Sequence, residues 1–101
     1  MYDIVYLPEA KKYLKKIKEQ KLKEKYRDAI KTIRQDPFVG IPKKGNLAGL
    51  FGYDIRHAKT SYELAYYIYK QENDNGAVII IMAGTRENFY EALKRHIGKI
   101  R

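Results

Sequence analysis

The chain has 101 residues, no cysteine and a formal net charge of +9. This length predicts a single domain, residues 1–101, with one hydrophobic core. The lack of cysteine excludes a disulfide-stapled secreted scaffold and any thiolate metal site. Such a basic chain favours a polyanionic partner such as nucleic acid, or an acidic protein.

Two features predict a cytoplasmic protein without a membrane span. The longest strongly apolar run, residues 77–83, is much shorter than the roughly 20 residues that a spanning helix needs. The first six residues lack the charged and apolar regions of a secretory signal. Membrane binding is also disfavoured, because the basic residues do not follow one strongly apolar amphipathic helix.

The first third of the chain predicts a strand followed by two helices. Residues 2–6 alternate as a short strand that stops before Pro8, which suits the first turn of a helix. Apolar residues at helical spacing predict helices over 8–19 and 22–36, with a break at Gln20-Lys21. Two adjacent amphipathic helices indicate a helical hairpin.

The remainder predicts a loop, three strands and a final helix. Residues 37–52 read as a loop because they contain two prolines and four glycines. Strands are expected over 53–57, 62–68 and 77–83, with turns at 59–61 and 73–76 and a helix capped by Thr85. The strand over 77–83 should be covered on both faces. The order β-α-α-β-β-β-α predicts an α+β fold, with the helical hairpin and a C-terminal helix on a mainly antiparallel four-stranded sheet.

The sequence contains no recognisable metal or cofactor motif. His57 and His96 lie in different predicted elements, and neither has the nearby carboxylates of a metal site. There is no nucleophile elbow and no glycine-rich phosphate loop before a helix. We therefore expect metal-free chemistry without a cofactor, or binding alone.

Arg86 and Tyr90 are the most informative pair of candidate site residues. Arg86 is expected at a helix start, where exposed N–H groups bind anions, so an arginine there builds a phosphate site. Tyr90 follows one turn later on the same side and offers a phenol for proton donation or stacking. The alternatives are an exposed arginine paired with Glu87, Glu91 or a distant carboxylate, and a tyrosine that anchors the last helix.

Other basic residues are candidates for contacts with a phosphate backbone. Arg56 and Lys59 lie on and after a predicted strand, and Lys43 and Lys44 lie in the loop before it. Their alternative roles are to discourage edge-strand aggregation and to keep the loop soluble. Two carboxylates, Glu63 and Glu87, are candidate bases or partners of the arginines.

Three segments resemble the RelE/ParE superfamily of bacterial toxins from toxin-antitoxin systems. They cover residues 47–56, 62–68 and 83–95, the last reading Ala-Gly-Thr-Arg-Glu-Asn-Phe-Tyr-Glu-Ala-Leu-Lys-Arg. The resemblance extends over nearly the whole chain when the element order and the lysine-rich hairpin are included. It implies a toxin with a concave basic face, neutralised by an acidic antitoxin in a hetero-oligomer.

The resemblance to the RelE-like branch implies a metal-independent endonuclease that cuts messenger RNA on the ribosome (an mRNA interferase). Arg56, Arg86 and Tyr90 then match catalytic positions, and Glu87 is a candidate proton carrier. Contacts with the RNA backbone are then expected from Lys43, Lys44 and Lys59. Arg86 with Tyr90 favours this branch over a ParE-like inhibitor that binds DNA gyrase. A non-catalytic basic RNA-binding domain is the third alternative.

Glu63 departs from the RelE-like pattern. Those nucleases often carry an arginine directly after the aromatic residue that opens the third strand, whereas Glu63 follows Tyr62 here. The substitution removes a positive charge that would stabilise a phosphate. Three alternatives follow: Lys59 supplies the charge, the nuclease is weak, or the target differs.

Overall fold

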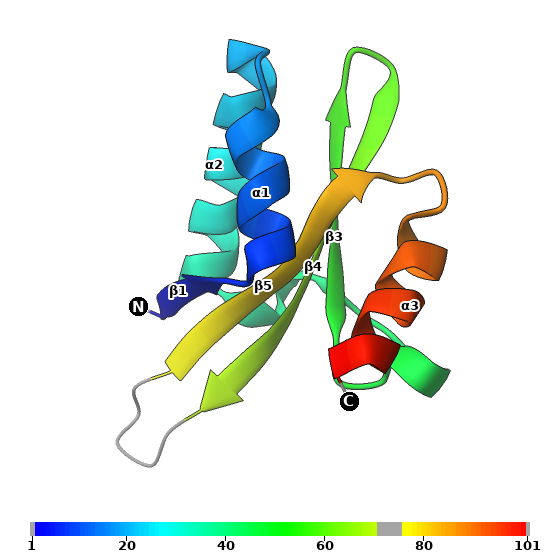
Figure 1. The fold of residues 1–101 in the computed structure, drawn as a ribbon. Helices are drawn as coiled ribbons and strands as arrows, with labels where there is room; N and C mark the ends of the chain where they lie inside the picture. Colours follow the sequence, from blue (N-terminus) through cyan, green and yellow to red (C-terminus); the bar gives the residue numbers. More distant parts are fainter. Residues whose placement is uncertain (1, 71–75, 101) are drawn as a thin grey trace.

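The computed structural model describes residues 2–70 and 76–100, in which a five-stranded sheet lies between a helical hairpin and a C-terminal helix (Figure 1). The elements in chain order are β1 (Asp3–Tyr6), α1 (Pro8–Lys16), α2 (Gln20–Gln35), β2 (Ile41–Pro42), β3 (Phe51–His57), β4 (Thr60–Lys70), β5 (Gly76–Thr85) and α3 (Phe89–Ile100), with short 3-10 helices at Pro37–Val39 and Gly45–Leu47. The α+β class and the helical hairpin are therefore confirmed.

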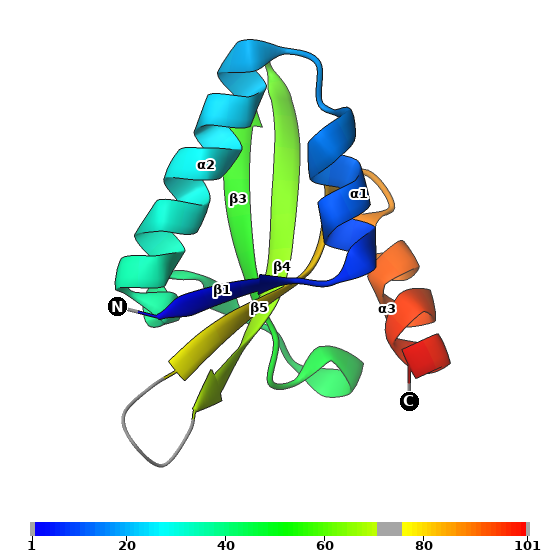
Figure 2. The ribbon, with the colours of Figure 1, turned by 60° about the vertical axis from the view of Figure 1, so that its left-hand side comes forward.

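The sheet has the order β1-β5-β4-β3-β2. β1 pairs with β5 in parallel, and the other neighbours pair antiparallel. α1 and α2 pack side by side on one face of the sheet, and α3 packs on the other (Figure 2). The middle strand β4 therefore contributes side chains to both layers.

Two hydrophobic clusters hold these layers together. The cluster under the hairpin joins α1 and α2 to the sheet through residues such as Ala10, Tyr26, Leu64 and Ile80. The smaller cluster on the opposite face is formed by Leu47, Leu50, Ala65, Ile81, Phe89, Leu93 and Ile97. The second cluster anchors α3 beside β4 and β5, and so sets where the side chains of α3 lie.

β5 contributes to both clusters and contains a β-bulge. Ala65 pairs with Met82 and Tyr66 pairs with Ile80, so Ile81 is an extra residue without a cross-strand partner. Ile80 belongs to the cluster under the hairpin and Ile81 to the cluster under α3. The continuous apolar run in β5 is explained by this burial on both faces, as the sequence predicted.

Several boundaries differ from the sequence-based expectation. The sheet has five strands because Ile41–Pro42 in the predicted loop pairs with β3. α1 ends at Lys16, so the break between the helices falls at residues 17–19. The β3–β4 turn lies at Ala58 and Lys59, whose positive φ angles of 49° and 67° suit a tight hairpin. Residues 73–75 of the other predicted turn lie outside the described residues.

Tyr66 of β4 connects residues 37–40, which precede β2, to the sheet through two hydrogen bonds. Its hydroxyl donates to the carbonyl of Pro37 at 2.7 Å and accepts from the N–H of Gly40 at 3.1 Å. Its ring stacks on Phe51, with 5.4 Å between centroids. A Cβ on Gly40 would collide with the Tyr66 hydroxyl and the carbonyl of Gly52, so only glycine allows this close approach.

None of the helices in residues 2–70 and 76–100 combines the length and hydrophobicity that crossing a membrane requires.

Candidate functional site

Four elements meet at the side chain of Glu63 on β4. The hydroxyl of Tyr90 on α3 donates to Oε2 of Glu63 at 3.0 Å. Nε of Arg86, in the turn between β5 and α3, lies 3.6 Å from Oε1 of the same carboxylate. Asp54 on β3 is the cross-strand partner of Glu63. The tertiary structure therefore gathers two acids, a phenol and a guanidinium from distant parts of the sequence.

The side chains of this cluster differ greatly in exposure. The Glu63 side chain is 1% exposed, whereas the Arg86 side chain is 62% exposed. Tyr90 is half-buried, and Asp54 is exposed. Arg86 and Tyr90 can therefore meet a ligand on the open side, and Glu63 lies behind them.

Gly52 and Lys43 complete this side of the sheet. Nζ of Lys43 lies 4.4 Å from the centroid of the Tyr90 ring, a cation–π arrangement. A Cβ on Gly52 would come within 2.6 Å of the Tyr90 hydroxyl and 2.7 Å of Cε of Lys43. The bare backbone at Gly52 thus leaves room for Tyr90 and Lys43 to lie across β3.

Burial raises the pKa of Glu63 to about 7. The neighbouring Asp54 carboxyl raises this pKa further, while the hydrogen bond from Tyr90 and the charge of Arg86 lower it. Burial, followed by the nearby Glu63 charge, also raises the pKa of Tyr90 above its ordinary value. Tyr90 therefore remains a neutral phenol near pH 7, while Glu63 is present in both protonation states.

The raised pKa of Glu63 predicts a loss of stability as the pH rises. Between its ordinary 4.5 and about 7, the folded protein holds a proton on Glu63 that the unfolded chain has released. The unfolding free energy should therefore fall across this interval, by up to about 3 kcal/mol from this group, and stay lower above it.

Chemical denaturation at pH 5 and pH 8 measures this effect. Relative to wild type, Glu63→Gln should gain stability on going from pH 5 to pH 8, because the amide does not ionise. Glu87→Gln, which changes an exposed carboxylate, is the matched control and should show no such gain. An equal pH response in the two variants would contradict the prediction.

The structure brings together some of the predicted site residues and separates others. Arg86, Tyr90 and Lys43 converge around Glu63. Arg56 lies on the same face of β3 as Asp54, two residues further along the strand. The other three candidates are exposed and make none of the contacts with Glu63 described above. They are Lys44 before the second 3-10 helix, Lys59 in the β3–β4 turn, and Glu87 in the turn before α3.

The expected helix start at Arg86 is wrong. β5 continues to Thr85, which pairs with Tyr62 instead of capping a helix, and α3 begins only at Phe89. The backbone N–H of Arg86 donates to the carbonyl of Ser61 at 2.9 Å. That N–H is therefore occupied, and the anion-binding capacity of Arg86 resides in its side chain.

Sequence reasoning did not identify Gly52 and did not predict the burial of Glu63. A glycine inside a strand signals close approach by another group, so Gly52 carried a usable signal. Nothing local to Glu63 indicates burial, because its neighbours Ser61 and Ala65 also suit a solvent-facing strand. Its burial results from α3 packing over β4.

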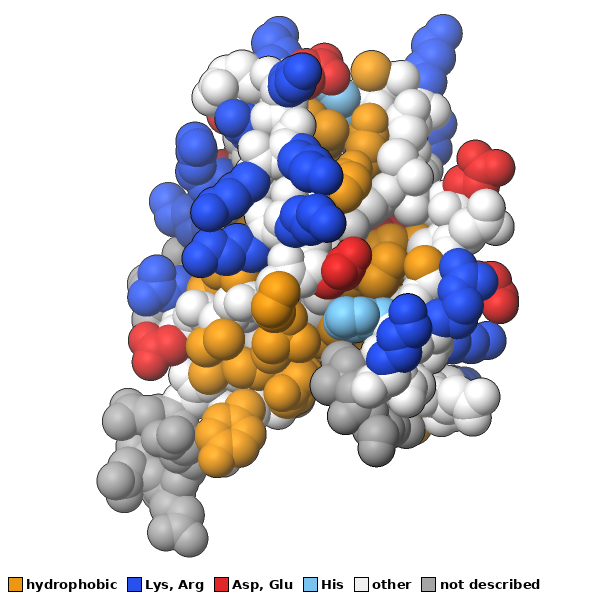
Figure 3. Space-filling model, viewed as in Figure 1, with side chains coloured by type: hydrophobic (Ala, Val, Ile, Leu, Met, Phe, Trp, Pro, Cys, Tyr) orange, Lys and Arg blue, Asp and Glu red, His pale blue; other side chains and the backbone are white. Residues whose placement is uncertain are grey.

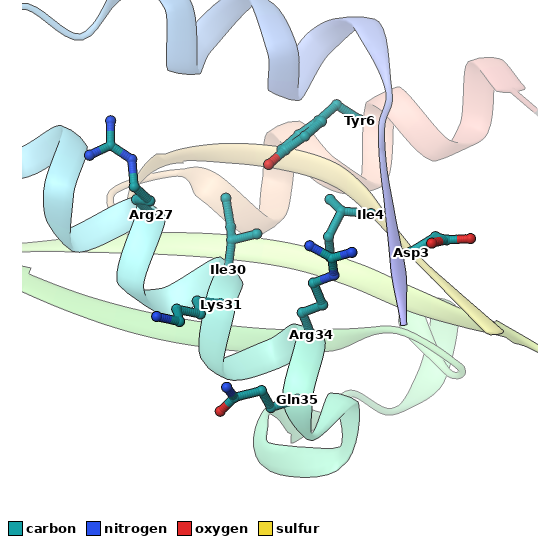
Figure 4. Close-up of a pocket in the computed structure, with 8 residues that line it drawn as sticks. All are labelled: Asp3, Ile4, Tyr6, Arg27, Ile30, Lys31, Arg34 and Gln35. Carbon is teal, nitrogen blue, oxygen red and sulfur yellow. The ribbon is translucent and has the colours of Figure 1, made fainter. Parts of the chain in front are cut away.

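A basic groove lies on the other side of the sheet, away from Tyr90. It has a volume of about 680 Å³ between β1 and α2 and is lined by Asp3, Ile4, Tyr6, Arg27, Ile30, Lys31, Arg34 and Gln35 (Figure 4). Arg27, Lys31 and Arg34 project from successive turns of α2, and Arg34 points toward Tyr6 of β1 (Figure 4). This groove offers positive charge beside an exposed tyrosine.

Basic and apolar surfaces alternate on the face seen in Figure 3. Lys and Arg side chains crowd the helical hairpin and the α3 side, and a hydrophobic patch lies between them. An apolar hollow of about 480 Å³ is lined by Leu7, Ala48, Gly49, Leu50, Tyr67, Ile81 and Ile97. Within the described residues, no group of three or more His, Cys, Asp or Glu side chains is placed to hold a metal ion.

A comparison with known protein families shows the class to which this chain belongs. Residues 4–94 match the model of a family described as the ParE-like toxin of type II bacterial toxin-antitoxin systems, and the chain belongs to this family. The predicted membership of the RelE/ParE superfamily is thereby confirmed. Among curated proteins, none matches the sequence significantly.

Solved structures of related toxins share the fold. A mutant of Escherichia coli RelE in the free state is 20% identical, with a TM-score of 0.65 over 93% of this chain and 96% of that chain. The intact E. coli RelBE toxin-antitoxin complex is 17% identical, with a TM-score of 0.62 over 83% and 95%. The toxin-antitoxin complex RelBE2 of Mycobacterium tuberculosis is 26% identical, with a TM-score of 0.60 over 84% and 98%.

Proposed function

We propose that this toxin is an endonuclease that cuts messenger RNA on the ribosome and so inhibits translation. The observation that carries the proposal is the convergence of Arg86 and Tyr90 on Glu63, with Lys43 beside them. A cation can stabilise the charge on a phosphate, and a neutral phenol and a carboxyl group with a pKa near 7 can transfer protons, as acid–base cleavage of RNA needs. Arg86 and Tyr90 face the open side of this cluster, and Glu63 is buried behind them.

In the proposed reaction, the ribose 2′-hydroxyl attacks the adjacent phosphate and displaces the 5′-oxygen. The exposed guanidinium of Arg86 binds the phosphate and stabilises the charge that builds on it. Tyr90 remains protonated near pH 7 and therefore acts as the proton donor to the departing oxygen. The RNA backbone is held by Arg56 and by the lysines Lys43, Lys44 and Lys59. Glu87 is a further proton carrier.

Tyr90 variants test whether the phenol takes part in chemistry. Tyr90→Phe keeps the ring and its contacts but loses the hydroxyl, so RNA cleavage should fall by about 100-fold or more. Tyr90→Ala should fail at least as completely, because it also removes the ring beneath Lys43. The measurement is primer extension on translated messenger RNA with purified ribosomes, with thermal melts to verify folding.

The outcome separates chemistry from stacking. Full cleavage by Tyr90→Phe together with failure of Tyr90→Ala would assign only a stacking role to the ring. If the wild-type toxin leaves the message uncut, the endonuclease proposal is wrong.

A second candidate function is inhibition of DNA gyrase by binding. It is favoured by Glu63, an acid placed where RelE-like nucleases often carry an arginine, because its carboxylate offsets part of the Arg86 charge. A supercoiling assay beside the translation assay distinguishes the two targets. Binding of RNA without effect in either assay would instead favour a non-catalytic RNA-binding domain.

We further propose an acidic antitoxin as the partner of this toxin. The net charge of +9 and the groove lined by Arg27, Lys31 and Arg34 suit an acidic segment laid across the hairpin and β1. The related RelBE structures are toxin-antitoxin complexes. A small acidic reading frame beside this gene, and a salt-sensitive complex on co-purification, would support the assignment.

A further inference from the structure

Glu63 has no direct access to a substrate. Its side chain is 1% exposed, and the structure connects it to the open side through the Tyr90 hydroxyl at 3.0 Å and Nε of Arg86 at 3.6 Å. Its influence on a bound RNA would therefore be exerted through the side chains around it, of which Tyr90 and Arg86 carry the groups suited to a phosphate.

The hydrogen bond between Tyr90 and Glu63 has two possible directions. An ionised carboxylate only accepts, so Tyr90 must then donate its single hydrogen to Oε2 and can offer only lone pairs to the open side. A protonated Glu63 carries a hydrogen of its own, which it can donate either to the Asp54 carboxylate or to the Tyr90 oxygen. When Glu63 donates to Tyr90, the phenol hydrogen is free to point outward, toward the site of a bound phosphate.

We propose that Glu63 is a positioning residue whose proton sets the direction of the Tyr90 hydrogen bond, so that Tyr90 can donate to RNA only while Glu63 is protonated. This inference rests on the proposed endonuclease function. As the bond from the 2′-oxygen to phosphorus forms and the bond to the 5′-oxygen breaks, the Tyr90 hydrogen passes to the 5′-oxygen. The Glu63 hydrogen passes to the Tyr90 oxygen, the 2′-hydroxyl proton passes to water, and Glu63 regains a proton from water.

The surroundings of Glu63 balance its two protonation states. Asp54 on β3 and burial beneath α3 favour the protonated acid, whereas Arg86 after β5 and Tyr90 on α3 favour the carboxylate. Lys43 reaches the same cluster over the Tyr90 ring, and the Tyr26 hydroxyl of α2 donates to the Glu63 backbone carbonyl at 3.4 Å. These opposing effects leave the pKa of Glu63 at about 7, so Glu63 can gain or lose its proton near neutral pH.

Single-turnover RNA cleavage at pH 6 and pH 8 tests the consequence for catalysis. The wild-type rate should fall about tenfold over this interval, following the protonated fraction of Glu63. The amide of Glu63→Gln does not ionise, so the rate of this variant should change by less than about twofold over the same interval. A role of Glu63 in packing alone would leave the two pH profiles parallel, and that result overturns the inference.

Carbon-13 NMR tests the hydrogen bond without relying on cleavage. The Cδ signal of Glu63 and the Cζ signal of Tyr90 should titrate in wild type with one common midpoint, and the Tyr90 inflection should vanish in Glu63→Gln. A Tyr90 signal that ignores the titration of Glu63 overturns the inference, even if Glu63→Gln does not fold. If the wild type cuts no RNA at either pH, the endonuclease proposal fails, and the NMR titration alone decides whether the Glu63 proton controls Tyr90.

Discussion

Arg86→Ala should abolish growth arrest and reduce RNA cleavage by at least about 100-fold, because it removes the exposed guanidinium that lies 3.6 Å from the Glu63 carboxylate. The fold should survive. Without the guanidinium, the pKa of the buried Glu63 rises further, so the acid takes up a proton instead of remaining an unpaired charge. We expect a stability loss of about 1 kcal/mol or less at pH 7.

Arg95→Ala is the matched control for this experiment. Arg95 is an exposed arginine on α3 outside the Tyr90 cluster, so its removal lowers the net charge by the same amount. Growth arrest in cells, primer extension and denaturant melts should be compared for the two variants and wild type. Full toxicity of a folded Arg86→Ala variant would exclude Arg86 from the site, and equal losses in both variants would indicate a general charge effect.

Tyr66→Ala should be the most destabilising of the substitutions considered, costing about 3 to 5 kcal/mol. Tyr66 is fully buried and packs in the cluster under the hairpin. The change removes a ring that stacks on Phe51 and also leaves the Gly40 N–H and the Pro37 carbonyl without this partner. A domain of this size has only about 5 to 15 kcal/mol of stability, so this substitution should remove a large share of it.

Tyr66→Phe separates the ring from the hydroxyl. It keeps the stack on Phe51 and should cost about 1 to 3 kcal/mol, the loss expected when buried hydrogen-bonding groups lose their partner. Urea denaturation of both variants measures the two contributions. Equal losses in Tyr66→Phe and Tyr66→Ala would show that the ring contributes little beyond its hydroxyl.

The helices and the main strands could be predicted because their signals are local. The apolar spacing in residues 8–36 is that of amphipathic helices, and the run over 77–83 is that of a strand buried on both faces. The predicted ends of strands and helices differ from the structure where pairing with a distant strand overrides the local preference of the chain. β5 extends through Thr85 because that residue pairs with Tyr62, and this pairing delays α3 until Phe89.

The candidate site shows the same division. Sequence alone determined the basic charge, the superfamily, and the choice of Arg86 and Tyr90 as residues to examine. Only the tertiary structure decided that they meet at Glu63, because β3, β4, the turn after β5 and α3 approach one another through long-range pairing and packing. The raised pKa of Glu63 could not be predicted from the sequence either. It results from the burial of Glu63 beneath α3 and from the opposing effects of Asp54 and Arg86.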